Sequence, residues 1–309
     1  MAGAITLTLA LMLPAGAQDY SVIGVKLQNR ANDVLAVMGF QVVPDLTTSS
    51  LSINDAGGEN PTLVMSQIGA GFAISDSFPL FIEGGVSYGR YDPVFLASNG
   101  VDTLRVPVKW NSLAAGLGVG WDFRLTETLV LRPIANINTG LVASDVRVAG
   151  EVLEDKTGQD LDFLKKGALR TFGYGGSLVL DYEYYRPDYL IDAEVRYSVM
   201  RLDSYNSSET VRGHADIANL NVWTRLRAPL KDWTAFEKPL RYVVELTHSE
   251  FLTDDQRGVL GFDKLTSFGL GLEVETTTLD LPITRGRVVG RYEFGENVSG
   301  FSLGFAVSF

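Results

Sequence analysis

The chain has 309 residues, of which 46% are hydrophobic and 20% charged, with 37 acidic against 26 basic side chains, a net charge of −11 and no cysteine. Apolar content this high excludes a disordered chain, and the lack of cysteine excludes disulfides and thiolate chemistry. A helical membrane bundle is excluded because no apolar run of about 18 residues follows the N-terminus. The acidic balance argues against nucleic acid as a partner.

The first 17 residues carry no charge and contain the apolar run Ala4 to Leu13, followed by Pro14 and by small residues at Ala15 and Ala17. This pattern predicts a secretory signal peptide, residues 1–17, cleaved near Ala17. Because no cysteine follows the cleavage site, a lipoprotein is not expected.

Residues 18–43 are predicted to hold one amphipathic helix, from about Val25 to Met38. Polar side chains, among them Lys26 and Arg30, fill one face of this helix. The other face has apolar side chains at helical spacing, namely Leu27, Ala31, Val34, Leu35 and Met38.

Residues 44–309 show the period of two that is typical of strands. In the last segment every second residue is apolar and large, and the residues between them are small: Phe301, Leu303, Phe305, Val307 and Phe309 against Ser302, Gly304, Ala306 and Ser308. Similar alternation recurs upstream, often with charged residues on the second face. Because few helices are available to cover the apolar faces, lipid is their expected neighbour.

Short connections alternate with long polar ones, as in outer-membrane barrels with short periplasmic turns and long external loops. The segment Pro229 to Pro239 is an exception, since it is long although it should be periplasmic. The sequence predicts an all-β fold, a transmembrane antiparallel β-barrel of about 12 strands with one N-terminal amphipathic helix. The strands are expected at 46–54, 61–74, 80–91, 104–125, 128–146, 167–185, 189–203, 212–228, 240–252, 258–276, 279–294 and 298–309.

A cleaved signal, a helix directly before an even barrel, and a last strand that ends on Phe309 resemble the translocator domain of autotransporters, whose helix threads the lumen. The resemblance implies that the barrel-assembly machinery is a partner and reads the terminal strand, at Phe301, Phe305, Val307 and Phe309. With only about 25 to 30 residues expected between the signal peptide and the first strand, no passenger is expected.

Charged residues are expected to line the lumen. The acidic ones fall mostly on early and middle strands and the basic ones on later strands: Glu83, Asp181, Glu183, Asp192 and Glu194, then Arg196, Arg225, Arg227, Arg241, Arg285, Arg287 and Arg291. Opposed ladders of this kind would form a pore constriction with a transverse field. The alternative, which we favour because such a lumen is narrow, is an ion-pair network that closes the interior.

In that network the polar face of the helix, with Lys26 and Arg30, is expected to lie against the acidic rungs Asp181, Glu183, Asp192 and Glu194. A periplasmic helix resting on the membrane edge is the other placement.

An enzyme is the competing interpretation, since His214 and Asp216 share one strand face near the external rim. That face is the outward one, and in His248-Ser249-Glu250 the serine points away from the histidine. We therefore expect no enzyme, no catalytic residue, no cofactor and no metal site.

The resulting expectation is a monomeric barrel in the outer membrane of a Gram-negative cell, in contact with outer-membrane lipid and lipopolysaccharide. Its role is predicted to be passive or assembly-related. A porin-like channel for small solutes is the alternative, and a rim hydrolase of omptin or phospholipase type is the third.

Overall fold

The computed structural model describes residues 21–22, 32, 35–39, 48–53, 62–92, 94–98, 103–107, 109–144, 168–205, 213–235, 237–275 and 285–308. Most of them belong to long antiparallel strands: β2 (Thr48–Ile53), β3 (Thr62–Ala73), β4 (Leu80–Tyr91), β7 (Trp110–Trp121), β9 (Leu129–Ser144), β10 (Ala168–Tyr185), β11 (Leu190–Tyr205), β12 (His214–Ala235), β13 (Lys238–Phe251), β14 (Lys264–Glu275), β15 (Arg285–Gly295) and β16 (Val298–Ser308). No helix in these ranges is both long and apolar enough to cross a membrane.

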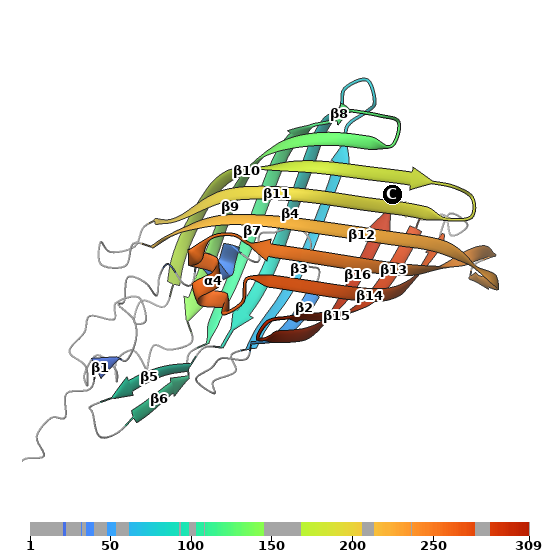
Figure 1. Ribbon diagram of the computed structural model, residues 1–309. Helices are drawn as coiled ribbons and strands as arrows, with labels where there is room; N and C mark the ends of the chain where they lie inside the picture. The colour runs from blue at the N-terminus through green and yellow to red at the C-terminus, as the bar shows by residue number, and fades with distance from the viewer. Residues whose placement is uncertain are drawn as a thin grey trace, which may run out of the picture.

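The strands close into a ring (Figure 1). Each pairs with its neighbours along the chain, β16 returns to pair with β2, and β10 pairs with β9 as well as β11. A two-residue strand, β8 (Phe123–Arg124), adds to β9 beyond the end of β7. The all-β barrel of about 12 strands predicted from the sequence is confirmed, and each long strand is paired on both sides over at least part of its length.

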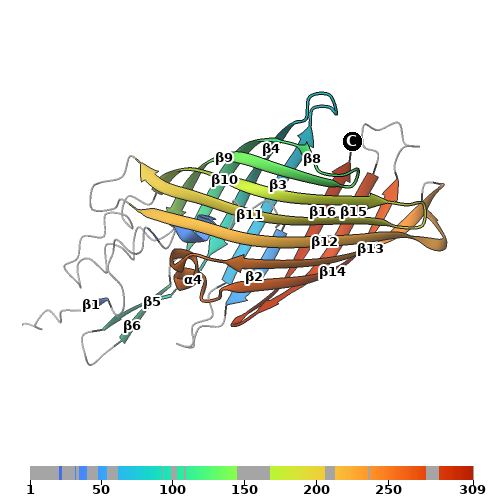
Figure 2. The same ribbon diagram turned by 45° about the horizontal axis from the view of Figure 1, so that its top comes forward.

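The two ends of the barrel differ. At one end, which we call the turn end, short connections join successive long strands of the ring. They are residues 74–79, 122–128 (which include β8), 186–189 and 236–237. The opposite end, the loop end, has a small sheet of β1 (Ser21–Val22), β5 (Val94–Ser98) and β6 (Thr103–Pro107) outside the ring, together with the helix α4 (Asp254–Leu260). Figure 2 shows the C-terminus at the turn end.

Two predicted boundaries are wrong. The strand expected at 104–125 is interrupted because β6 pairs with β5 in the loop sheet, and β7 begins at Trp110. The strand expected from residue 258 begins at Lys264, since residues 254–260 form α4, which starts with two aspartates and ends at Gly261 in the left-handed conformation. The start of the strand expected from residue 279 is not tested, because the structure describes this strand from Arg285 onward and residues 276–284 lie outside the described ranges.

The long connection expected from Pro229 to Pro239 is also wrong. β12 continues to Ala235, and β13 starts at Lys238 after a turn in which Glu237 has a φ of 63°. Pro229 is tolerated here because β11 starts at Leu190, opposite Arg227, so the proline lies beyond the last pair of that ladder. The register between β12 and β13 also shifts between Pro229 and Thr234.

Alternation along the strands divides the side chains between an apolar outside and a polar inside. Large apolar residues face outward and stay exposed, as Phe301 (70%), Phe305 (68%) and Leu270 (58%) show. Water would disfavour an apolar belt of this extent, whereas hydrocarbon accepts it. The outer surface is that of a transmembrane barrel.

The buried apolar core lies inside the ring at the loop end. Part of the predicted N-terminal helix is described: residues 35–39 are helical, and Leu35, Ala36, Val37 and Met38 are buried. In Figures 1 and 2 this segment, coloured blue, lies within the ring beside α4. It packs in one cluster with side chains of the wall that we call the apolar collar, namely Leu63, Met65, Val142, Leu169, Leu202 and Ile217.

The lipid-facing belt leads to a first prediction. Leu270 lies in the middle of β14 on the outer face, so Leu270→Arg should lower the free energy of unfolding in lipid vesicles by about 2–4 kcal/mol. Leu270→Met, which keeps an apolar side chain of similar size, is the matched control and should change it little. Equal stability of the two variants in denaturant titration would contradict the outward register of β14.

Candidate functional site

All of the predicted lumen charges lie on inward-facing positions of their strands, alternating with outward residues. They form two walls. The first wall is built from β12 to β15 together with Asp192 of β11. The second is built from β4, β9 and β10 together with Glu194 and Arg196 of β11. Each wall contains acidic and basic side chains, so the interior is a set of ion pairs rather than two segregated ladders.

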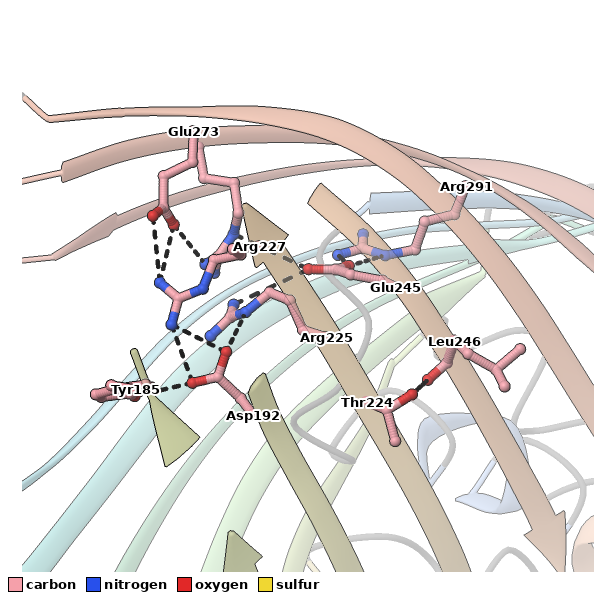
Figure 3. Close-up of polar contacts among 10 residues, drawn as sticks. Tyr185, Asp192, Thr224, Arg225, Arg227, Glu245, Leu246, Glu273 and Arg291 are labelled. Carbon is pink, nitrogen blue, oxygen red and sulfur yellow. Dashed lines mark hydrogen bonds and ion pairs between the residues drawn. The ribbon is translucent and has the colours of Figure 1, made fainter. Parts of the chain in front are cut away.

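Asp192 is the centre of the first wall (Figure 3). Its carboxylate accepts hydrogen bonds from Arg225 Nε at 2.9 Å, from Arg227 Nη2 at 3.1 Å and from the Tyr185 hydroxyl at 2.9 Å. The side chain of Asp192 is 5% exposed and that of Arg227 is 4% exposed. Since Arg225 and Arg227 are two residues apart on β12, the strand period points both guanidinium groups to the same carboxylate.

Two buried glutamates that sequence reasoning did not select complete this wall. Glu245 accepts hydrogen bonds from Arg291 Nη2 at 2.6 Å and Nε at 2.9 Å. Glu273 accepts them from Arg227 Nη1 at 3.1 Å and Arg287 Nη1 at 3.3 Å, and Arg241 approaches it within 3.8 Å. The expected basic ladder on the later strands is therefore largely neutralised by acids of the same strands. Alternation places these glutamates inside, but their partners depend on the register between strands.

The second wall is held by two arginines. Arg196 donates to both carboxylate oxygens of Glu83, at 3.1 and 3.0 Å, and to Glu194 at 2.9 Å. Arg132, which sequence reasoning did not select as a lumen residue, binds Asp122 through Nε and Nη2. Its guanidinium group also lies 3.4 Å from Asp181 and stacks over the ring of Phe81. Arg132 and Asp122 come from the two sides of one hairpin turn, which is why neither stands out as a pair in the sequence.

A cavity of about 650 Å³ lies inside the barrel, and side chains of both walls line it. On the loop side it reaches Ala114 and Met200, which belong to the same cluster as the apolar collar. Amides and hydroxyls occupy its middle level, including Asn136, which donates to Glu83 at 3.0 Å and accepts from Ser177 at 2.9 Å. This volume lies within the range of small-molecule sites, roughly 300–1,000 Å³.

The predicted contact between the helix and the acidic rungs stays a prediction, because Lys26 and Arg30 lie outside the described residues. Arginines of the walls bind Asp192 and Glu194 and approach Asp181. The described part of the helix is held by apolar packing, with Met38 Sδ 3.1 Å from the Thr171 hydroxyl. Asn32 Oδ1 accepts a hydrogen bond from the backbone N–H of His214 at 2.9 Å.

The rim histidines lie on the outer face, as expected. Asp216 is 3.7 Å from Arg201, and the backbone N–H of Asp216 donates to Asp255 of α4 at 2.9 Å. His248 lies 2.8 Å from the Thr266 hydroxyl and 3.5 Å from Glu250, all on the outer face. These contacts tie neighbouring strands to each other and to α4.

The expected assembly signal is described in part. Phe301 and Phe305 lie on the outer face of β16, so both side chains point to lipid. Val307 lies within β16, whereas Phe309 falls outside the described residues. The partner that this strand would engage stays a prediction.

The wall around Asp192 leads to a second prediction. Asp192→Asn removes the carboxylate that Arg225 and Arg227 share, which leaves Arg227 with Glu273 and Arg225 with only a 3.9 Å approach to Glu245, and the free energy of unfolding should fall by about 3–5 kcal/mol. The matched control is Asp76→Asn, which removes the acid of an exposed pair with Arg124 at the turn end and should have little effect. A variant at Asp192 as stable as the control, measured by denaturant titration in vesicles, would contradict the role given to this carboxylate.

Comparisons with known proteins give structural matches alone. No protein-family model matches the chain, and no curated protein matches its sequence. Among solved structures, it is similar to the beta domain of the Bordetella autotransporter BrkA, with 13% identity, 85% of this chain and 96% of that chain covered, and a TM-score of 0.48. It is also similar to the translocator domain of the autotransporter NalP from Neisseria meningitidis, with 12% identity, 91% of this chain and 95% of that chain covered, and a TM-score of 0.44. A third similar structure is the transport unit of the autotransporter AIDA-I from Escherichia coli, with 10% identity, 93% of this chain and 100% of that chain covered, and a TM-score of 0.46. The resemblance to autotransporter barrels inferred from the sequence is thus found again among solved structures, and at these values it supports no statement about function.

Proposed function

We propose that this chain is a non-enzymatic integral barrel of the outer membrane, of the autotransporter type, whose lumen is closed at the loop end by its own N-terminal helix. The observation that carries the proposal is the burial of Leu35 and Met38, which are 0% and 1% exposed inside the ring of strands. An apolar helix turn that fills an apolar collar leaves little room for water at that level.

The outer surface supports a membrane location. Its exposed apolar side chains form a belt around the ring, and strand pairing around the ring satisfies backbone hydrogen bonds that lipid cannot. The turn end would then face the periplasm and the loop end, with α4, the lipopolysaccharide layer. Because the belt already has lipid as its neighbour, the barrel is proposed to be monomeric.

The charged walls support a passive role. Most inward charges of the described strands have a partner on another strand, which makes the wall a stabilising network. We find the rim hydrolase less supported, because the histidine and the serine at positions 248 and 249 point to opposite faces of β13.

A channel for small solutes is the second candidate, and the lumen cavity of about 650 Å³ is the observation in its favour. In that case the helix acts as a removable plug rather than as a permanent one. The two candidates differ in conductance, because a permanently filled collar blocks ions and a displaceable one does not.

The helix therefore leads to a third prediction. In planar bilayers the refolded chain that begins at residue 18 should show little conductance. Deletion of residues 18–40 should open the barrel, because it removes the side chains that fill the apolar collar. A shorter deletion, residues 18–31, keeps Leu35 to Met38 and is the matched control, which should stay closed. If both deletions conduct no more than the full chain, the helix is not what closes the lumen.

Recognition of the terminal strand leads to a fourth prediction. Deletion of Phe309 should lower the amount of heat-modifiable barrel in the outer membrane, because the assembly machinery is proposed to read this residue before the barrel closes. The control is Phe294→Ala, which removes another outward aromatic side chain, 44% exposed, from β15. Equal abundance of the two variants would contradict a signal at the C-terminus.

A further inference from the structure

The charges that line the cavity are incompletely paired in a pattern that suggests a ligand. On β10 and β11, Asp181 lies directly opposite Glu194, and Glu183 directly opposite Asp192. Like charges placed directly across a sheet destabilise it unless a cation intervenes. Asp192 has two arginines of its own, so the unbalanced charge remains on Asp181, Glu183 and Glu194.

Too few cations face these acids within the described part of the chain. Arg196 is shared between Glu83 and Glu194, and Arg132 between Asp122 and Asp181. The contact of Arg132 with Asp181 is the longer one, 3.4 Å, and no ion pair of Glu183 is found among the described residues. Three carboxylates of this wall, Asp181, Glu183 and Glu194, line the cavity next to two shared guanidinium groups, so this side of the cavity has an excess of negative charge.

The other wall, on β12 and β15, has guanidinium groups with spare donors. Arg287 and Arg225 both line the cavity, and each approaches Glu245 only within 3.9 Å. Glu245 is bound more closely by Arg291, at 2.6 Å. Arg287 keeps one hydrogen bond, to Glu273 at 3.3 Å, so several of its five N–H donors are available to a group in the cavity.

We propose that this cavity binds a small zwitterionic solute, with its ammonium group at Asp181 and Glu194 and its carboxylate at Arg287 and Arg225. A guanidinium pair binds a carboxylate in a planar, charge-assisted geometry, and an ammonium group between two opposed carboxylates relieves their repulsion. Glu183, which is exposed, lies between Asp181 and the turn end of β10 and would attract the cationic group on entry from that end. The inference does not depend on the helix that closes the loop end.

The test uses the refolded full chain in detergent and three probes of equal length: 6-aminohexanoate, hexylammonium and hexanoate. Isothermal titration calorimetry should show binding of 6-aminohexanoate at least about tenfold tighter than that of either singly charged probe, since each of them leaves one pole of the cavity unpaired. Equal affinity of hexylammonium and 6-aminohexanoate, or binding of none of the probes, would overturn the proposal.

Variants locate the site within the barrel. Asp181→Asn and Arg287→Gln should each weaken binding of 6-aminohexanoate by about tenfold or more. Glu127→Gln, in the exposed turn after β8, is the matched control and should bind as the parent chain does. Heat-modifiable migration on gels shows whether each variant is folded. Folded variants at Asp181 and Arg287 that bind as tightly as the control would refute the site. That result would leave the proposed closure of the lumen standing, because the conductance of the helix deletions tests it separately.

Discussion

Closure of the strands into a ring surrounded by lipid is the constraint on which the rest of this structure depends. The period of two forces every second side chain inward, and lipid excludes charge from the outward positions. Guanidinium and carboxylate groups therefore meet inside, where few waters compete. Asp192, which is bound by Arg225, Arg227 and Tyr185, is the clearest result, since three neighbouring strands meet at one buried carboxylate.

The same constraint divides the lumen along its length. Near the turn end the walls are charged and pair with themselves, so they do not need the helix as a partner. Near the loop end the inward residues are apolar, and the helical turn from Leu35 to Met38 fills the space between them. The cavity extends from the charged walls to the apolar collar, and Asp181, Glu183 and Arg287 are the lining charges that the walls leave incompletely paired. Stability and the proposed binding thus depend on the charged walls, and closure depends on the collar.

The sequence predicts the strand number and the facing of nearly every strand, because alternation is a local property of residues such as Phe301 to Phe305. It does not predict α4, because the polar run Thr253 to Gly258 is typical of an external loop, or the continuation of β12 past Pro229, which depends on where β11 begins. The sequence also does not predict which arginines bind Glu245 and Glu273, because these ion pairs depend on the register between strands. The expected contact of Lys26 and Arg30 with the acidic rungs stays a prediction, because both residues lie outside the described part of the chain, while arginines of the wall bind Asp192 and Glu194 and approach Asp181.

The described turn of the N-terminal helix lies in the lumen, where its apolar residues pack against the wall. Because the chain has no cysteine, a single Val37→Cys substitution gives a specific reporter at a side chain that is 4% exposed. A membrane-impermeant maleimide should leave this cysteine unmodified in the folded barrel and modify it after heat unfolding, whereas a cysteine introduced by Asp254→Cys on exposed α4 should react in both states. Modification of the two cysteines at the same rate in the folded barrel would contradict this placement.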